Sequence, residues 1–275
     1  MILARSAPDA AAVADHYDEL DPFYRSLWGE HVHHGLWTRG DESPEAAVEA
    51  LSDLVAELID PAASARLLDI GCGYGATARR IAGARGAAVT GLTLSAAQAG
   101  HAPAHEGVTL LVRDWLDNRL ADASFDGAYA IESSEHMVDK PRFFAEAARV
   151  LRPGARLVVC AWLAETDASP WRVRHLLEPI CHEGRLPSMG TRQDYEGWAG
   201  AAGLLPVDYS DVSQQVARTW TICMRRFAAA VLMDRDTRAR TLAARNRLFA
   251  LSLPRLILAY RTGAMRYGVF TWRKG

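Results

Sequence analysis

Short apolar runs alternate with amphipathic segments through the first two-thirds of the chain. Near-continuous apolar runs lie at residues 65–70, 87–92, 108–112, 125–131 and 155–162. Such runs are typical of strands buried on both faces of a parallel sheet. Helical patterns cover residues 43–59 and follow Gly75, Ser95 and Lys140. The alternation predicts an α/β fold built on a Rossmann-like, doubly wound, mostly parallel seven-stranded sheet.

The alternation of apolar runs and helical patterns ends after residue 162. Helical patterns cover residues 170–182 and 191–202, and a strand is predicted at 204–212. A long helical region follows from 213 to about 250, and the alternation of residues 264–274 predicts a final strand. We therefore predict an N-terminal lid (1–42), a cofactor-binding core (43–163), a helical cap (164–203) and a C-terminal segment that completes the sheet (204–275).

The composition is that of an ordinary globular protein. Hydrophobic residues make up 49% of the chain and charged residues 23%, which excludes a disordered chain. The longest apolar run, residues 157–164, is too short to span a bilayer. Acidic residues stand where a signal peptide needs an apolar core, and the four cysteines form no C-x-x-C pair. We expect a cytoplasmic protein with reduced thiols and no membrane span.

Positive charge is concentrated at the C-terminal end. The net charge is −2, yet Ser213 to Gly275 hold thirteen Arg or Lys against two Asp. Such a segment suits nucleic acid, an acidic carrier protein or a diphosphate group. Only two of the 31 basic residues are lysines, which is typical of codon bias toward arginine. This bias favours a different interpretation, an amphipathic helix with a solvated arginine face, over a binding segment. The acidic remainder and the lack of a binding module argue against a nucleic-acid partner.

The stretch "LLDIGCGYGATA" (67–78) runs from a buried strand into glycines and then a helix. Glycines at Gly71 and Gly73 let a ligand approach the backbone at the carboxyl end of the first strand. A dinucleotide site would read G-x-G-x-x-G, and Ala76 at its last position is a tolerated variant, so spacing alone leaves that alternative open. Asp69 before the first glycine gives the order D-x-G-x-G, which resembles motif I of the S-adenosylmethionine-dependent methyltransferases.

Three further stretches narrow the resemblance. "WGEHVHHG" (28–35), "AIESSEHMVDK" (130–140) and "YRTGAMRYGVFTWRK" (260–274) resemble the gamma-tocopherol methyltransferase family, in the branch that also holds sterol-type and cyclopropane-fatty-acid enzymes. The likeness spans nearly the whole chain. One departure is Ala155, where a second glycine is usual in the turn after "LRP".

The resemblance implies S-adenosylmethionine as the cofactor, with S-adenosylhomocysteine as its product, and a cofactor site at three strand ends. The first strand end would contribute Asp69, Gly71, Cys72 and Gly73. The second would contribute Thr93, Leu94 and Gln98, with hydroxyl and amide groups near the ribose where other sites carry an acid. The third would contribute Asp114 for the adenine amino group and Trp115, which either flanks the purine or belongs to the core.

The histidines of residues 31–34 suit a lid better than a metal site. In an extended segment His31 and His33 share one face, while His34 points away. We predict no metal, because no Cys or Asp cluster nearby completes four ligands. The resemblance instead implies a lid over the cofactor, with Trp28 and Tyr17 beside it, since aromatic faces attract a sulfonium cation.

His136 is the predicted base, and Glu132 is the second predicted catalytic residue. An ordinary histidine pKa lies near neutrality, and Glu132 is placed to contact the cofactor or stabilise a developing cation. The alternative for both is helix capping and loop bracing. Tyr195 and Trp220 are predicted to line the acceptor pocket.

The family acts on small lipophilic molecules, which implies an aromatic, indole or prenylated natural product of secondary metabolism as the acceptor. We favour C-methylation. One alternative is methylation of a prenyl alkene coupled to terpene-type cyclisation, and an alternative of another class is a non-catalytic cofactor-binding regulator. Self-association is left open.

Overall fold

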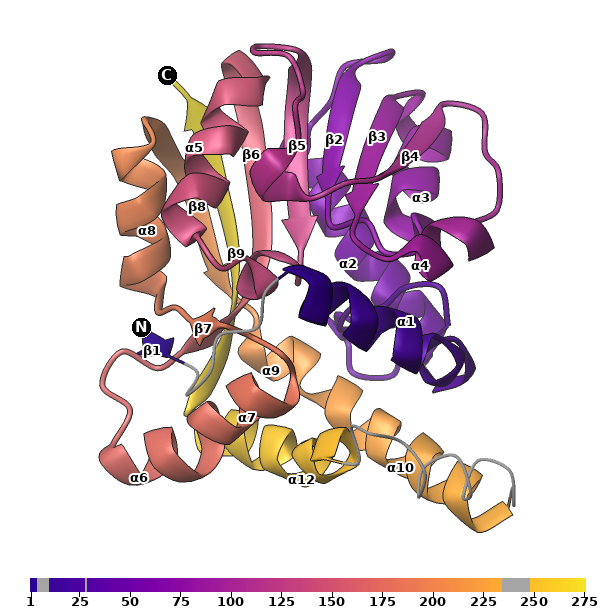
Figure 1. The fold of residues 1–275 in the computed structure, drawn as a ribbon, viewed down its shortest axis with the longest axis vertical. Coiled ribbons are helices and arrows are strands. Elements are labelled where there is room, and N and C mark those ends of the chain that lie inside the picture. The colour runs from indigo at the N-terminus through magenta and orange to yellow at the C-terminus, as the bar shows by residue number, and fades with distance from the viewer. Residues whose placement is uncertain (4–9, 28, 234–247) are drawn as a thin grey trace.

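The computed structural model describes residues 1–3, 10–27, 29–233 and 248–275. One twisted sheet stands between two layers of helices, and further helices gather below its lower edge (Figure 1). Trp28 and the arginines between residues 234 and 247 lie outside the described residues, so the predictions made for them have no structural counterpart here.

Within the described residues, seven strands form the main sheet in the order β4-β3-β2-β5-β6-β9-β8. They are β2 (Arg66–Ile70), β3 (Ala88–Thr93), β4 (Val108–Val112), β5 (Phe125–Ile131), β6 (Leu151–Ala164), β8 (Leu204–Asp211) and β9 (Met265–Lys274). Neighbours from β4 to β6 pair in parallel, and β9 is antiparallel to β6 and β8. The predicted Rossmann-like, mostly parallel seven-stranded sheet is confirmed.

Both faces of the sheet are covered, which explains the continuous apolar runs. Helices α2 (Pro44–Ile59) and α3 (Ala76–Arg85) pack on one face, and α5 (Lys140–Val150) and α8 (Arg192–Ala201) pack on the other. Alternate residues of β6 enter different cores: Val158 joins the cluster with α2, and Val159 joins the cluster with α5. Ser43 caps α2 by accepting the backbone N–H of Ala46.

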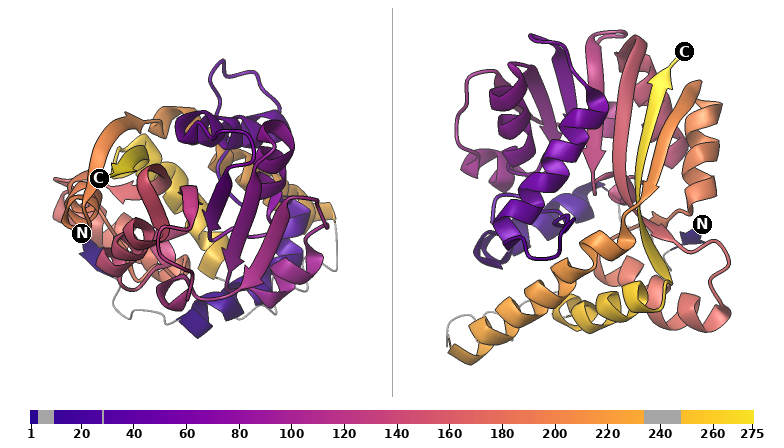
Figure 2. Two further views of the ribbon diagram at one scale, coloured as in Figure 1. Left: turned by 90° about the horizontal axis from the view of Figure 1, so that it is seen from above. Right: turned by 180° about the vertical axis from the view of Figure 1, so that it is seen from behind.

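The carboxyl ends of the parallel strands meet a group of helices of different lengths. These are α1 (Ala10–Leu27), α4 (Ala96–His101), α6 (Pro170–Arg172), the π-helical turn η3 (Val173–Leu177), α7 (Glu178–Glu183), α9 (Ser213–Val216), α10 (Arg218–Met233) and α12 (Leu248–Arg261). Two 3₁₀ turns, η1 (Trp115–Asp117) and η2 (Ser134–His136), follow β4 and β5. Seen from behind, α10 extends away from the sheet beside α12 (Figure 2). No helix among the described residues is both long and apolar enough to cross a membrane.

Several elements differ from the sequence expectation. Helix α8, predicted within the cap, packs against α5 and β8 on a face of the sheet. Strand β6 begins at Leu151, because its first residues pair with β5 across a register shift. A short sheet of β1 (Ile2–Leu3) and β7 (Ser188–Met189) was not predicted, since two-residue strands leave no periodicity. The boundaries proposed for lid, core and cap remain predictions.

Part of the C-terminal positive charge is neutralised within the chain. Arg226 pairs with Glu45, Arg255 with Glu183 and Arg266 with Glu165. The amphipathic helix with a solvated arginine face stays a prediction.

Candidate active site

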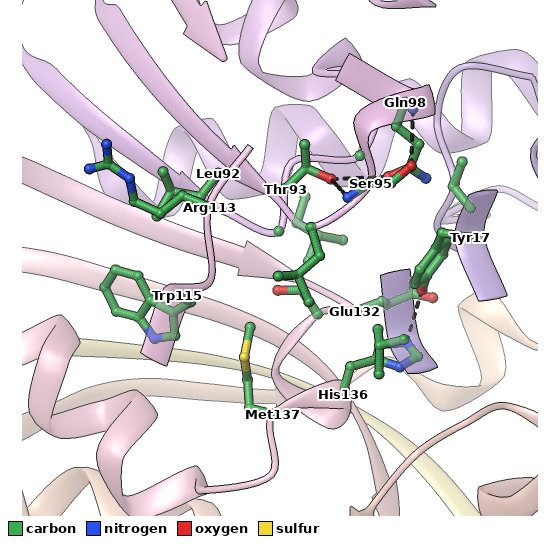
Figure 3. A pocket seen from close by; sticks show the side chains of 17 residues that line it. Tyr17, Leu92, Thr93, Ser95, Gln98, Arg113, Trp115, Glu132, His136 and Met137 are labelled. Carbon is green, nitrogen blue, oxygen red and sulfur yellow. Dashed lines mark hydrogen bonds between the residues drawn. The ribbon is translucent and has the colours of Figure 1, made fainter. Parts of the chain in front are cut away.

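A pocket of about 640 Å³ opens at the carboxyl ends of β2, β3 and β5 (Figure 3). Its walls are mainly apolar, with polar groups from the ends of β3 and β5. The lining side chains belong to Val13, Tyr17, Val32, Leu92, Thr93, Leu94, Ser95, Gln98, Arg113, Trp115, Ile131, Glu132, Ser133, His136 and Met137, beside Gly71 and Gly73. A second cavity of about 350 Å³ adjoins it across the same two glycines. The glycine loop therefore forms a wall of both cavities.

The glycine loop is a cradle that a side chain would fill. Gly71 has φ +83°, and a Cβ at that position would lie 2.3 Å from the Ser133 Cβ. Gly73 has φ +53° and faces open space, with the Gln98 amide nitrogen 3.9 Å from an added Cβ. The missing side chains therefore let a ligand lie directly against the backbone.

Asp69 opens onto the smaller cavity together with Cys72. The Asp69 side chain is buried, and burial raises its pKa to about 7, opposed by an interaction with the Tyr129 hydroxyl. A cationic group of a ligand in this cavity would restore its ordinary ionisation. The amino group of S-adenosylmethionine is such a cation, so the donor set fits the expected cofactor.

At the end of β3, Thr93, Leu94 and Gln98 line the larger pocket, as the resemblance implies. The Thr93 hydroxyl donates to Gln98 Oε1 at 3.2 Å and accepts the backbone N–H of Ser95 at 3.2 Å. Hydroxyl and amide groups thus stand where a dinucleotide site carries an acid. We propose these side chains for the ribose of the cofactor.

The end of β4 departs from the expectation. Asp114 caps η1 by accepting the backbone N–H of Leu116 at 2.8 Å, and it is absent from the walls of the two cavities among the described residues. Trp115 belongs to the core and also lines the pocket. Its indole N–H donates to the Phe143 carbonyl at 3.3 Å, and its ring forms part of the pocket wall. Arg113, which sequence reasoning missed, lines the pocket beside Trp115 (Figure 3).

His31 and His33 meet on one face, as the alternation predicts. His31 Nδ1 lies 3.2 Å from His33 Nε2, and His33 Nδ1 donates to the His34 carbonyl at 2.8 Å. Burial, with the neighbouring His33 and arginines, lowers the pKa of His31 to about 3. Both rings line the smaller cavity as neutral imidazoles.

His34 faces away from the cavities and binds Glu132. The two Glu132 oxygens accept four hydrogens: the His34 backbone N–H at 2.7 Å, His34 Nδ1–H at 2.9 Å, the Trp162 indole N–H at 2.9 Å and the Tyr267 hydroxyl at 2.8 Å. Burial acts to raise the pKa of Glu132, but His34 and these hydrogen bonds outweigh it and hold the pKa at about 2. The Glu132 backbone has φ +53°, a conformation that the surrounding contacts impose. Glu132 therefore joins the histidine segment to β6 and β9.

Replacing Glu132 with Gln should destabilise the protein by about 3 kcal/mol. Whichever way the new amide is turned, its NH₂ faces an N–H that cannot turn away, either the His34 backbone or the Trp162 indole. The folded carboxyl has a pKa below its unfolded value, so its stabilisation is present above about pH 4.5 and is lost as the pH falls toward 2. Urea unfolding of both proteins from pH 3 to 7 should show the difference shrinking at acid pH.

Glu165→Gln is the matched control, because Glu165 is partly exposed and pairs with Arg266. It should change the unfolding free energy by no more than about 0.5–1 kcal/mol. Equal stability of the wild type and Glu132→Gln at pH 7 would contradict the bracing role of Glu132.

His136 lies in η2 with its ring at the pocket wall (Figure 3). Its Nδ1 lies 3.4 Å from the Arg185 carbonyl, which can only accept, so Nδ1 carries the hydrogen. The Tyr17 hydroxyl then donates to Nε2 at 2.9 Å. Burial lowers the pKa of His136 to about 4, well below the near-neutral value expected from the sequence. The ring is therefore neutral at physiological pH and able to accept a proton.

Tyr195 and Trp220 lie in the core, away from the walls of the described pockets. Tyr195 stacks on Phe270, with ring centroids 5.5 Å apart, and its hydroxyl lies 2.9 Å from Ser134 Oγ. Trp220 packs edge to face on His34. Periodicity marks both correctly as apolar positions, but it cannot tell a pocket wall from a core.

Within the described part of the chain, no group of three His, Cys, Asp or Glu side chains is arranged to hold a metal ion. The prediction that no metal is needed stays untested.

Residues 68–159 match a family described as a methyltransferase domain. The chain is 30% identical to a probable chloroplastic tocopherol O-methyltransferase of Oryza sativa subsp. japonica, over 95% of this chain and 77% of the relative. It is 34% identical to the 27-O-demethylrifamycin SV methyltransferase of Amycolatopsis mediterranei (strain S699), over 80% of this chain and 83% of the relative.

Among solved structures, the cyclopropane synthase MmaA2 from Mycobacterium tuberculosis superposes with a TM-score of 0.86. The match covers 98% of this chain and 100% of that one at 24% identity, which bears on the fold alone. The cyclopropane synthase therefore has the same arrangement of sheet and helices as this chain.

Proposed function

Because the chain belongs to the S-adenosylmethionine-dependent methyltransferases, in the branch related to the tocopherol and sterol-type enzymes, and therefore methylates a small molecule, we propose that its acceptor is a hydroxyl group of a lipophilic molecule. The observation that carries the proposal is the pairing of a neutral His136 with the Tyr17 hydroxyl at an apolar pocket. The names of both relatives also refer to methylation at oxygen.

The proposed cofactor residues are those that the two cavities bring together. They are Asp69, Gly71, Cys72, Gly73, Thr93, Leu94 and Gln98, with Trp115 and Arg113 at the far wall. When bound, S-adenosylmethionine supplies an electrophilic methyl group on its sulfonium and leaves as S-adenosylhomocysteine. Apolar walls exclude water from the acceptor, and orientation then provides most of the rate enhancement.

His136 takes up the proton that the acceptor loses. As the new O–CH₃ bond forms, the hydroxyl O–H becomes strongly acidic, so an imidazole with a pKa near 4 is basic enough to accept its hydrogen at Nε2. The Tyr17 hydroxyl, which holds Nε2 in this structure, relays that proton from the acceptor. The Arg185 carbonyl keeps the hydrogen on Nδ1. The lone pair of Nε2 is therefore left to accept from the Tyr17 hydroxyl at the pocket wall.

The walls favour an uncharged acceptor. Val13, Val32, Ile131 and Met137 supply apolar surface near Tyr17 and His136. Among the described lining residues, Arg113 is the fixed cation, and it lies beside Trp115 on the opposite side. A phenol or hydroquinone carrying an alkyl or prenyl chain matches this chemistry better than a diphosphate.

C-methylation, favoured from the sequence, is the second candidate. A ring carbon also releases a proton after methylation, so the same base serves it. Methylation of an isolated alkene with cyclisation needs groups that stabilise a carbocation, but Glu132 is saturated by four donors and Tyr195 and Trp220 lie in the core.

Product analysis tests the proposal. The protein is incubated with methyl-¹³C S-adenosylmethionine and a panel of prenylated phenols and hydroquinones. Each compound is paired with the analogue in which every hydroxyl is converted to an O-ethyl ether. We expect the free phenols to yield methyl ethers by NMR and the blocked ethers to give no product. Label on a ring carbon, or turnover of the blocked ethers, would overturn methylation at oxygen.

A further inference from the structure

Lys140 is a buried cation that the proposed reaction does not yet use. Its side chain is 3% exposed, and it occupies the first residue of α5. The N-terminus of a helix repels positive charge, and a buried ammonium is costly unless its hydrogens are satisfied. Burial and the helix N-terminus thus both disfavour an ammonium at Lys140. Its hydrogen-bond partners should therefore explain its position.

The Lys140 ammonium donates to three oxygens. They are the Glu135 carbonyl at 3.2 Å, the Met137 carbonyl at 3.1 Å and the Ser188 hydroxyl at 2.8 Å. All three ammonium hydrogens are therefore used. The two carbonyls belong to the residues immediately before and after His136, so one side chain fixes the backbone on both sides of the base. Ser188 lies in β7, which ties this arrangement to the short sheet with β1.

The charge of Lys140 also acts on the His136 ring. Burial is the main cause that lowers the His136 pKa to about 4, the Arg185 carbonyl opposes it, the Lys140 ammonium lowers it further, and the Glu132 carboxylate opposes it. Tyr17, from α1, faces the same ring with a neutral hydroxyl. Burial lowers the pKa of Lys140 itself to about 8, with Glu135 opposing, so the ammonium remains charged at neutral pH.

We propose that Lys140 is the positioning residue of the base: it fixes the peptide groups flanking His136 and sets a positive charge against protonation of the imidazole. The inference rests on the proposed role of His136 and adds a function for a residue outside the pocket wall. Lys140 aims the Nε2 lone pair and keeps it available across the working pH range.

Lys140→Met tests this, and Lys274→Met is the matched control, because these are the only two lysines in the sequence and Lys274 donates to the distant Leu151 carbonyl. We expect Lys140→Met to lower kcat about tenfold or more while KM for the cofactor stays within about twofold. The acid limb of the pH–rate profile should move up by about one pH unit, because removing the ammonium eases protonation of His136. Lys274→Met should change neither.

A second measurement keeps this inference separate from the proposed function. His136 is titrated by ¹³C-histidine NMR in the wild type and in Lys140→Met, with its signal assigned by its loss in His136→Gln. Wild-type turnover in His136→Gln would overturn the base, whereas an unmoved His136 titration in folded Lys140→Met would overturn the role of Lys140. If circular dichroism shows that Lys140→Met does not fold, Lys140→Gln takes its place, because its uncharged amide carries two hydrogens for the two carbonyls. His136 must then show the same upward titration shift, and an unmoved titration overturns the inference.

Discussion

His136→Gln should lower kcat by about a hundredfold or more. Glutamine keeps a polar group near the Tyr17 hydroxyl but cannot take up a proton, so the acceptor loses its base. In the wild type the rate should be flat from about pH 5 to pH 7 and fall as the pH drops through about 4, because the imidazole must be neutral to act. Steady-state kinetics with the phenol that turns over best provides the measurement.

The matched control is His105→Gln, an exposed histidine in the loop before β4. It should retain the wild-type rate. Affinity for S-adenosylhomocysteine, measured by calorimetry, should stay within about twofold in both variants, so that the loss is assigned to chemistry. A wild-type kcat in folded His136→Gln would contradict the base.

Gly73→Asp should remove cofactor binding, with an affinity loss of about a thousandfold or more, equivalent to about 4 kcal/mol. The φ of +53° is one that aspartate tolerates better than most residues, so the fold should survive. An added side chain meets only the distant Gln98 amide and therefore projects into the pocket, where it occupies the space of the ligand. Calorimetry with S-adenosylhomocysteine should show no heat of binding.

Gly86→Asp separates the pocket from the backbone effect. Gly86 has φ +65° at the end of α3, and an added Cβ there meets nothing within 4 Å. It imposes the same substitution on a similar backbone conformation outside the cavity. Its affinity for the cofactor product should equal that of the wild type, and an equal loss in both variants would refute steric exclusion at Gly73.

The fold was predictable where burial imposes a repeat. Strands covered on both faces are continuously apolar, so β2, β3, β5 and β6 stand out from the sequence. The antiparallel partner β9 was placed by its alternation and by the family resemblance. The face on which α8 packs was not predictable, because an amphipathic pattern gives one apolar stripe without naming the surface it meets.

The glycine loop was more predictable from the sequence than the state of the titratable side chains around it. Glycines after a strand mark a close backbone approach, so Gly71 and Gly73 follow from local chemistry. The state of a titratable group depends on neighbours far apart in sequence: Glu132 is saturated by residues 34, 162 and 267, and His136 depends on Tyr17 and Arg185. Asp114 illustrates the same limit, since an acid at a strand end equally serves as a cap.

Burial of Lys140 also determines where the protein can be tethered. Amine-reactive reagents find three primary amines: Lys140, enclosed by its three acceptors, the partly exposed Lys274 and the α-amino group of Met1. Lys274 ends β9, at the edge of the sheet opposite the strand ends that form the pocket (Figure 1). A label or solid support coupled through Lys274 would therefore attach away from the pocket and leave its entrance open.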